Sequence, residues 1–367
     1  MLSLILLFMK LAARAVYFCF KLLPTDNKVV LISRKNRTTS IDFRLLVERL
    51  AIDQPSTRAV VLNHPLGNPL TALRRFIVEM YHLATARAVI IDSYVPAVSI
   101  LNHKPGLVVV QIWHALGAIK KFGRQILDLP EGSSSRLANA MDMHRNYSYV
   151  TVGSSLTAPT YAAAFGIDES RIKPVGLPRV DYLVNKANQA ADRARVLAAF
   201  PELTDKQVIL YAPTFRKTEQ INPAKIAEAL GDDYKLLVSQ HRLDKAEIQA
   251  SDRLVVNDRF DVLELLAAAD AVVTDYSAVV FEAALSSKPL YFYAYDLRQY
   301  ESDRGLAMDY RQTMPGAINE SVDGLVAAIK ARAYSPDRIK DFASKYVSVR
   351  DGSCSERIIK LLELDRK

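Results

Sequence analysis

The sequence predicts an α/β protein built from two Rossmann-like halves that face a cleft. The chain has 367 residues, which is too long for one ordinary core and suits two domains. Short runs rich in Val and Ile alternate with longer amphipathic stretches, which is the pattern of βαβ units with parallel sheets. A polar, alanine-rich stretch, Leu183–Pro201, separates five of these runs from five others.

Residues 1–23 form an almost wholly apolar segment that Lys10, Arg14 and Lys21 interrupt. A spanning helix needs about twenty predominantly apolar residues, and a signal peptide carries its positive charge before the apolar run, so neither is favoured. At about 100° per residue the three cations project within a sector of roughly 40°. We therefore expect residues 1–24 to form an interfacial membrane helix, with its cations toward anionic headgroups and its other sides in the acyl boundary. The alternative is an ordinary buried core helix.

The body of the chain is predicted to comprise an N-terminal Rossmann-like domain at residues 25–185 and a second at residues 186–345. Residues 346–367 are expected to form a C-terminal helix that packs back on the first domain. The candidate strands, in chain order, are Val29–Ser33, Ala59–Leu62, Ala88–Ile91, Leu107–Ile112, Tyr149–Val152, Val208–Tyr211, Lys235–Val238, Leu254–Val256, Ala271–Thr274 and Leu290–Tyr293.

The composition is that of a folded globular protein that favours anionic partners. Half of the residues are hydrophobic, and Lys plus Arg exceed Asp plus Glu by eight. Nucleic acid is not predicted as a partner, because the chain has no RNP-like pattern, zinc-finger spacing or lysine-rich tail. Cys19 and Cys354 lie far apart in the sequence, which supports neither a disulfide framework nor a cysteine-based metal site. Dinucleotide-binding, P-loop, zinc-protease and hydrolase-elbow motifs are absent from the sequence.

The candidate functional residues follow the strands, because ligands of open α/β sheets collect beyond the carboxyl ends of the strands. In the first half, Trp113 and His114 follow the fourth strand, and a glycine and a basic cluster come next. The cluster consists of Lys120, Lys121 and Arg124. Taken singly, a strand-end Trp or His is more often a packing residue than a catalytic one.

In the second half, three strand ends carry polar groups. Thr214 and Arg216 follow the first of these strands, and His241 and Arg242 follow the next. Asp275, Tyr276 and Ser277 precede the helical run Ala278–Leu285, which makes a strand, a polar turn and a helix N-terminus that suit a phosphate. The simpler interpretation of that turn is an N-cap. Two histidines and several cations after strands of both halves favour one shared cleft.

These stretches resemble one family. The segments WHALGAIKKFG, VGLPRVDYL, LYAPTFRK and DVLELLAAADAVVTDYSAVVFEAALSSKPLYFYAYDLRQYESDRG are similar to the CDP-glycerol glycerophosphotransferases, the teichoic acid primases and polymerases of Gram-positive bacteria. The resemblance implies a GT-B fold and transfer of glycerol phosphate from CDP-glycerol to a hydroxyl of a membrane-anchored acceptor, with release of CMP. A peripheral position at the cytoplasmic face of the membrane is implied as well.

The resemblance also implies roles for individual residues. His114 matches the proposed general base, His241 the second functional histidine at the donor phosphates, and Ser277 a residue at the donor pyrophosphate. Glu282 lies where the family usually has an acidic residue. Three departures concern donor geometry: Ala278 replaces a usual serine, Arg242 a common proline, and Val180 a usual asparagine.

The expected mechanism is a positioned phosphoryl-group transfer. An imidazole has an unperturbed pKa near 6.5, so His114 can take the proton of the attacking hydroxyl. Trp113 and the basic cluster are expected to line the cleft on the acceptor and membrane side. The expected donor and phosphate residues are Thr214, Arg216, Arg242, Asp275, Ser277, Ala278 and Glu282. No metal site or obligatory cofactor is expected, although the carboxylate of Asp275 could bind a divalent cation.

The expected partners are CDP-glycerol, an undecaprenyl-diphosphate-linked disaccharide or similar lipid-linked acceptor, and an anionic membrane surface. Because the long N-terminal extension of the large polymerases is missing, a primase or short transferase is favoured. The alternatives are a polymerase, a CDP-ribitol-using transferase, a GT-B glycosyltransferase that uses a nucleotide-sugar, and a non-enzymatic membrane-associated scaffold.

Overall fold

A computed structural model describes residues 2–34, 38–63, 68–214, 216, 222–239 and 248–365. The chain divides into two compact units. The N-terminal unit comprises residues 1–115, 121–181 and 349–367, and the C-terminal unit comprises residues 116–120 and 182–348.

The bounds of these units differ from the predicted ones. The chain passes from one unit to the other within helix α7 (Pro178–Val184), between Asp181 and Tyr182, and returns to the N-terminal unit at Val349. The short segment 116–120 belongs to the C-terminal unit although the residues on both sides of it belong to the N-terminal unit.

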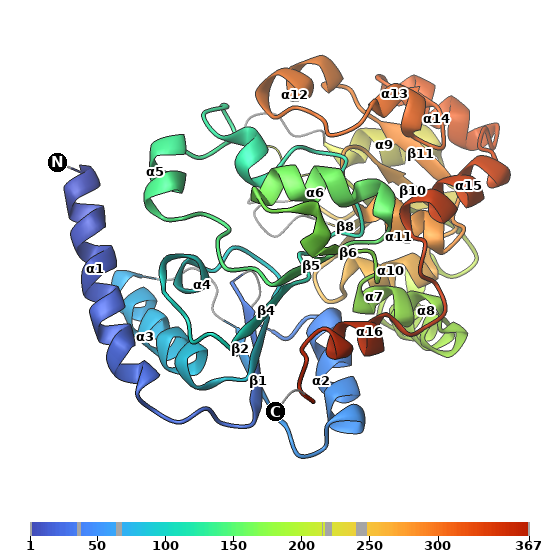
Figure 1. Cartoon of the computed structure of the whole chain (residues 1–367). Coiled ribbons are helices and arrows are strands. Elements are labelled where there is room, and N and C mark those ends of the chain that lie inside the picture. The colour runs from blue at the N-terminus through green and yellow to red at the C-terminus, as the bar shows by residue number, and fades with distance from the viewer. Residues whose placement is uncertain are drawn as a thin grey trace. The chain divides into compact units, whose positions relative to one another are not determined.

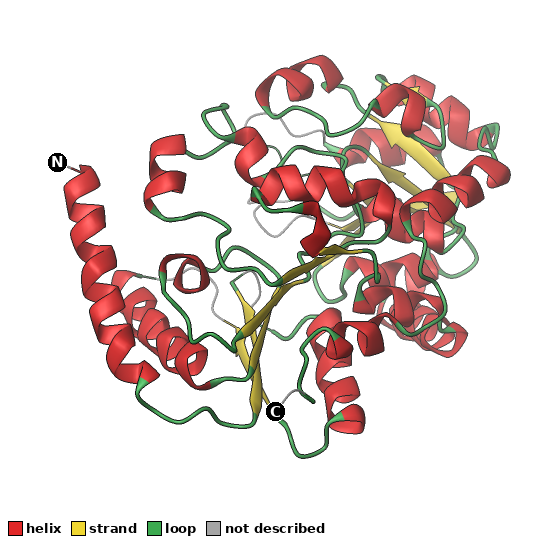
Figure 2. Ribbon diagram, in the orientation of Figure 1, coloured by secondary structure: helices red, strands yellow, loops and turns green. Residues whose placement is uncertain are grey.

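The N-terminal unit contains a parallel six-stranded sheet in the order β2-β1-β3-β4-β5-β6. Figure 1 labels most of its strands, and Figure 2 shows strands in yellow and helices in red. Five strands of this sheet were expected from the sequence, whereas β6 is only two residues long and has too little pattern to be recognised. The strands are β1 (Lys28–Ser33), β2 (Arg58–Asn63), β3 (Ala88–Ile91), β4 (Val108–Gln111), β5 (Tyr149–Thr151) and β6 (Ile172–Lys173). Its other helices are α1 (Leu2–Lys21), α2 (Ile41–Asp53), α3 (Pro69–Thr85), α4 (Pro96–Ile100), α5 (Ser135–Ala140), α6 (Ala158–Phe165) and α16 (Cys354–Lys360).

The C-terminal end of the chain is part of the N-terminal core. Ile358 of α16 lies in one hydrophobic cluster with Val29 of β1 and Phe43 of α2. The Asp181 carboxylate accepts the backbone N–H groups of Cys354 and Ser355 at 2.8 and 2.7 Å, which holds the start of α16. Of the described residues in the segment 346–367, Tyr346 ends α15 and Cys354–Lys360 form α16.

The C-terminal unit contains a second parallel six-stranded sheet, in the order β12-β11-β10-β7-β8-β9. Its strands are β7 (Gln207–Ala212), β8 (Tyr234–Ser239), β9 (Leu254–Asn257), β10 (Ala271–Thr274), β11 (Leu290–Tyr293) and β12 (Ile318–Asn319). Its helices are α8 (Lys186–Ala199), α9 (Pro223–Leu230), α10 (Val262–Ala268), α11 (Val279–Leu285), α12 (Leu297–Asp303), α13 (Tyr310–Thr313), α14 (Val322–Lys330) and α15 (Pro336–Tyr346). Because β7 lies between β10 and β8, the ends of these three strands come together at one edge.

Helix α1 is present, but its orientation is opposite to the expected one. Lys10 and Arg14 point toward the body of the N-terminal unit, where both pair with Asp142. Tyr17 is 1% exposed, whereas Phe8 is 73% exposed. The cations therefore face protein and apolar side chains face outward, because a carboxylate of the unit itself neutralises the basic face. In the described part of the chain, no helix is both long and apolar enough to cross a membrane.

Candidate active site

The candidate site of the N-terminal unit begins where β4 ends. Trp113 has a φ of 51°, which is unusual for a residue with a large side chain. Its backbone N–H donates to Oε1 of Gln111 at 2.8 Å, and Nε2 of Gln111 donates to the Ser93 carbonyl at 3.1 Å. A fully buried amide therefore holds the turn that presents Trp113 and His114.

The His114 ring is oriented by a backbone carbonyl. Its Nδ1 lies 3.2 Å from the carbonyl oxygen of Asp92, at the end of β3. Because a carbonyl can only accept, this contact requires the proton on Nδ1, which leaves Nε2 as the basic nitrogen of the neutral ring. The half-buried ring is thus in the tautomer that a general base needs.

Arg179 supports His114 and was missed as a site residue, although it lies in the motif VGLPRVDYL. Its Nη1 donates to the His114 carbonyl at 3.1 Å. Its Nε donates to both carboxylate oxygens of Asp42 at 3.3 and 3.1 Å, and its backbone N–H donates to Asp42 Oδ1 at 2.9 Å. This planar fork ties α2, α7 and the His114 turn together.

An aromatic cluster surrounds Trp113. The indole stacks on Phe122, with ring centroids 5.3 Å apart, and meets Phe165 edge-on at 5.3 Å. His144 contacts Trp113 edge-on at 6.3 Å and is 1% exposed. Burial, followed by the charge of Arg124, lowers the pKa of His144 to about 3, so this ring is neutral and acts as a packing group.

The three residues of the basic cluster do not all belong to the same unit. Lys120 belongs to the C-terminal unit, where it forms an antiparallel bridge with Leu306 and its Nζ lies 3.4 Å from Oγ1 of Thr214. The backbone pairing of residues 119 and 120 with residues 306 and 307 holds Lys120 there, beside Thr214, one of the residues predicted for the donor side. Lys121 is exposed and belongs to the N-terminal unit, as does Arg124, which donates to Asn139.

Gly117 lies in the same short segment and is required for packing. A Cβ atom there would lie 2.5 Å from the Phe281 ring of α11. The glycine therefore makes room for this aromatic ring of the C-terminal unit.

Thr214, Arg216 and Asp275 come together at the ends of the paired strands β7 and β10. The Thr214 backbone N–H donates to Oδ1 and Oδ2 of Asp275 at 2.9 and 3.1 Å. Nη2 of Arg216 donates to Oδ2 of Asp275 at 2.8 Å. The Asp275 carboxylate therefore orients two neighbouring groups.

Arg216 has a second carboxylate partner, Asp296, whose Oδ2 lies 2.6 Å from Nε. The guanidinium also lies over the rings of Tyr276 and Tyr300, at 5.1 and 4.9 Å from the centroids. Burial opposes the charged form, but Asp275 and Asp296 raise the pKa of Arg216 above its usual range. Arg216 thus stays charged and orders the strand ends; sequence reasoning missed Asp296, which lies on a later loop.

The turn after β10 presents Ser277 and Ala278, both half-buried. Helix α11 begins at Val279 with Ala278 as its N-cap and no side-chain cap, so the expected start of the helix is one residue early. Ser277 Oγ lies 3.5 Å from the Val279 N–H, at the limit of a hydrogen bond. Glu282 is only 2% exposed, inside α11.

Two of the predicted site residues, His241 and Arg242, lie outside the described residues. Within the described ranges, no group of three or more His, Cys, Asp or Glu side chains could hold a metal ion. Asp275 was the one residue for which a bound divalent cation was considered. Its carboxylate accepts hydrogen bonds from the Thr214 backbone N–H and from Nη2 of Arg216.

Comparison with known proteins gives a consistent result. The family described as CDP-glycerol:poly(glycerophosphate) glycerophosphotransferase matches residues 15–364. The teichoic acid ribitol-phosphate primase of Bacillus spizizenii is 32% identical over 355 residues, covering 92% of this chain and 91% of that protein. The teichoic acid glycerol-phosphate transferase of Staphylococcus aureus is 29% identical over 383 residues, covering 95% and 97%. The teichoic acid glycerol-phosphate primase of Bacillus subtilis is 28% identical over 306 residues, covering 81% and 77%.

Solved structures share the fold. The wall teichoic acid polymerase TagF aligns with a TM-score of 0.79 at 22% identity, covering 96% of this chain and 93% of that one. The UDP-GlcNAc 2-epimerase of Methanocaldococcus jannaschii aligns with a TM-score of 0.55 at 15% identity, covering 92% and 99%. The predicted architecture of two Rossmann-like halves is confirmed.

Proposed function

The chain belongs to the CDP-glycerol:poly(glycerophosphate) glycerophosphotransferase family, and on this premise we propose that it transfers glycerol phosphate from CDP-glycerol to a hydroxyl group of a lipid-linked acceptor in teichoic acid biosynthesis. The observation that carries the proposal is His114, whose Nδ1 faces the Asp92 carbonyl at the tip of a strand. A primase-like single addition fits the relatives of similar length, the glycerol-phosphate transferase among them.

In the proposed reaction, the acceptor oxygen attacks the phosphorus that carries glycerol. Nε2 of His114 takes the hydroxyl proton as the new P–O bond forms, and the bond from that phosphorus to the CMP oxygen breaks. A positioned base of this kind contributes typically about 10²–10⁴-fold to the rate. The charge that moves onto CMP requires cationic and hydrogen-bonding groups on the donor side.

We assign these donor groups to the C-terminal unit. The ammonium of Lys120 beside the Thr214 hydroxyl supports a phosphate contact there, and the half-buried Ser277 hydroxyl is proposed at the pyrophosphate. Asp275 and Arg216 hold this loop in shape through their mutual pair. By family resemblance, His241 also belongs to the donor side, and we place Arg242 there because it follows His241 directly in the sequence.

We further propose that the protein works at the cytoplasmic face of the membrane as a peripheral protein. Support comes from exposed apolar side chains of α1 and of α3, two helices that lie side by side in Figure 1. The rings of Phe20 on α1 and Tyr81 on α3 are 6.2 Å apart. This α1–α3 apolar surface includes Phe8, Met9, Phe18, Leu70, Leu73 and Ile77. The exposed Arg74 on α3 adds a cation beside it. Such a surface suits burial in the headgroup and acyl boundary.

A transfer assay tests the proposed function. Purified protein is incubated with CDP-glycerol, CDP-ribitol or a nucleotide-sugar together with a lipid-linked disaccharide, and products are resolved by mass. We expect one added glycerol phosphate and release of CMP. Transfer of a sugar, or no transfer from either CDP-alditol, would refute the proposal.

His114→Ala provides the matching mutational test. We expect loss of transfer by about 10²-fold or more, because the base that acts on the acceptor is removed. Binding of CDP-glycerol, measured by calorimetry, is expected to persist, because the proposed donor groups lie in the other unit. Turnover at the wild-type rate would remove His114 from the mechanism.

A second donor, CDP-ribitol, has specific support. The relative that is 32% identical over 92% of this chain is named for ribitol phosphate. The same assay decides between the two alditols by the mass of the product.

A further inference from the structure

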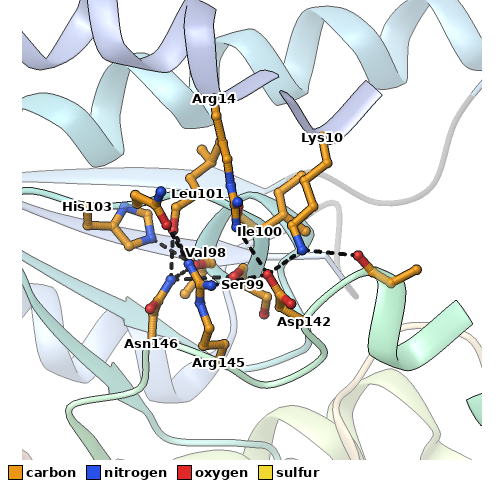
Figure 3. Close-up of polar contacts among 12 residues, drawn as sticks. Lys10, Arg14, Val98, Ser99, Ile100, Leu101, His103, Asp142, Arg145 and Asn146 are labelled. Carbon is orange, nitrogen blue, oxygen red and sulfur yellow. Dashed lines mark hydrogen bonds and ion pairs between the residues drawn. The ribbon is translucent and has the colours of Figure 1, made fainter. Parts of the chain in front are cut away.

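The inward-facing cations of α1 meet at one carboxylate. Oδ2 of Asp142 lies 2.5 Å from Nζ of Lys10, 3.2 Å from Nη2 of Arg14 and 3.2 Å from Nη1 of Arg145 (Figure 3). We call these four residues the Asp142 cluster. Nε of Arg14 also donates to the Ile100 carbonyl at 2.8 Å. Helix α1 is therefore attached by partly buried ionic contacts to the loop that follows α5.

That loop has an unusual backbone. Asp142, His144 and Asn146 have φ values of 46°, 67° and 74°, although none is a glycine. Such conformations cost free energy and persist only where surrounding contacts hold them. Asn146 is held by the carbonyls of Val98 and Leu101 at 2.8 and 2.9 Å. At Asp142, the ionic contacts include those with Lys10 and Arg14 of α1.

The same loop reaches the candidate base. His144 lies two residues after Asp142, fully buried, with its Nδ1 3.0 Å from the Tyr147 hydroxyl. Its ring meets the edge of Trp113, whose own ring lies 4.3 Å from that of His114. Trp113 also has a positive φ, so both ends of this contact depend on their neighbours for their conformation.

We propose that the Asp142 cluster positions the candidate base. The cluster fixes the 142–146 loop, and His144 of this loop in turn holds the Trp113–His114 turn in place. Helix α1 is thereby a structural part of the catalytic half. The inference rests on the proposed function for its kinetic consequence. Because the apolar side chains of α1 face outward while its cations hold the loop, the helix that forms part of the proposed membrane surface also supports the base. Asp142 is a positioning residue that acts through other groups.

Trp113 is the only tryptophan of the chain, so intrinsic fluorescence reports this turn directly. We compare wild type with Asp142→Ala and with the double variant Lys10→Met, Arg14→Met, all as full chains without membranes. The expected result is an emission shift to longer wavelength and stronger acrylamide quenching in both variants. The control is Lys21→Met, since Lys21 donates only to the exposed Asn102 carbonyl, and its spectrum should match wild type.

Kinetics with a soluble acceptor analogue separate positioning from general damage. We expect Asp142→Ala to lower kcat by about tenfold or more, because small displacements of a base have large effects. KM for CDP-glycerol should stay unchanged, and Asp142→Glu should recover most of the loss. A circular dichroism melt establishes whether each variant is folded. If Asp142→Ala is unfolded, the fluorescence and kcat of the double variant Lys10→Met, Arg14→Met test the proposal instead.

The outcomes are distinct. Unchanged Trp113 fluorescence and unchanged kcat in the folded variants would overturn the positioning role. A tenfold rise in KM for CDP-glycerol without loss of kcat would overturn the positioning role as well. Absence of transfer by wild type would instead refute the proposed function and leave the fluorescence comparison to decide the inference.

Discussion

Lys120 and Lys121 are neighbours in the chain with different structural surroundings. Lys120 lies beside Thr214 in the C-terminal unit, whereas Lys121 is exposed in the N-terminal unit. We expect Lys120→Ala to raise KM for CDP-glycerol or lower kcat by about tenfold, the size of one charge-assisted contact. Lys121→Ala is the matched control and should leave donor kinetics unchanged. Equal effects of the two substitutions on donor kinetics would contradict the assignment of Lys120.

Arg179 is a second residue whose geometry gives a prediction. Its guanidinium binds the buried Asp42 and the His114 carbonyl at once, and the single ammonium of a lysine cannot reproduce this planar, bidentate arrangement. We expect Arg179→Lys to cost about 2 kcal/mol of stability, from hydrogen bonds to a charged group, and to lower kcat with little change in donor KM. Thermal melts and steady-state kinetics check both effects. A variant with wild-type Tm and kcat would show that the fork is dispensable.

At the scale of elements, α1 has to be reconsidered. A chain that begins near Asp26 lacks the whole of α1. The structure adds that this truncation removes Tyr17, whose hydroxyl contacts His103 at 2.8 Å, and two of the cations at Asp142. We now expect a chain without residues 1–24 to bind anionic liposomes poorly and to lose roughly 5 °C in Tm.

The comparison is made by liposome sedimentation and by calorimetry of both proteins. Undiminished sedimentation of the truncated protein would place the membrane contact on α3 or elsewhere. An unchanged Tm would mean that the contacts of α1 contribute nothing to the stability of the N-terminal unit.

At the scale of the whole molecule, the buried His144 and the half-buried His103 predict a pH dependence of stability. Burial lowers the pKa of His103 to about 4 and that of His144 to about 3, below the value of about 6.5 expected in the unfolded chain. Between these values the unfolded state binds protons that the folded state does not, so stability falls as the pH is lowered from 6.5 toward 4. Each histidine contributes at most about 1.4 kcal/mol per pH unit.

Thermal melts between pH 7.5 and 4.5 check this dependence. Tm should fall on the acid side, and His144→Phe should make the fall less steep, because one of the two protonation sites is gone. If Tm of His144→Phe fell with pH as steeply as Tm of wild type, His144 would be excluded as a source of the acid sensitivity.

The sequence by itself determined the two parallel sheets and the residues at their tips. Apolar runs such as Ala88–Ile91 and Ala271–Thr274 are strands with the predicted bounds, because a strand buried on both faces is encoded locally as a continuous apolar run. The same rule placed Trp113 and His114 just after β4, and the family motifs identified the class of enzyme. The strands β6 and β12, two residues each, are too short to carry such a pattern.

The tertiary structure alone decided which groups meet. Periodicity put Lys10, Arg14 and Lys21 on one narrow face of a helix, but the side toward which that face points depends on Asp142, 128 positions after Arg14. The place of Lys120 beside Thr214 likewise depends on a backbone bridge to Leu306. The Asp92 carbonyl that sets the His114 tautomer and the Asp42 that holds Arg179 are also distant in sequence. Local pattern determines elements, whereas the partner of a charge or of a ring nitrogen is fixed only by the packing of distant segments.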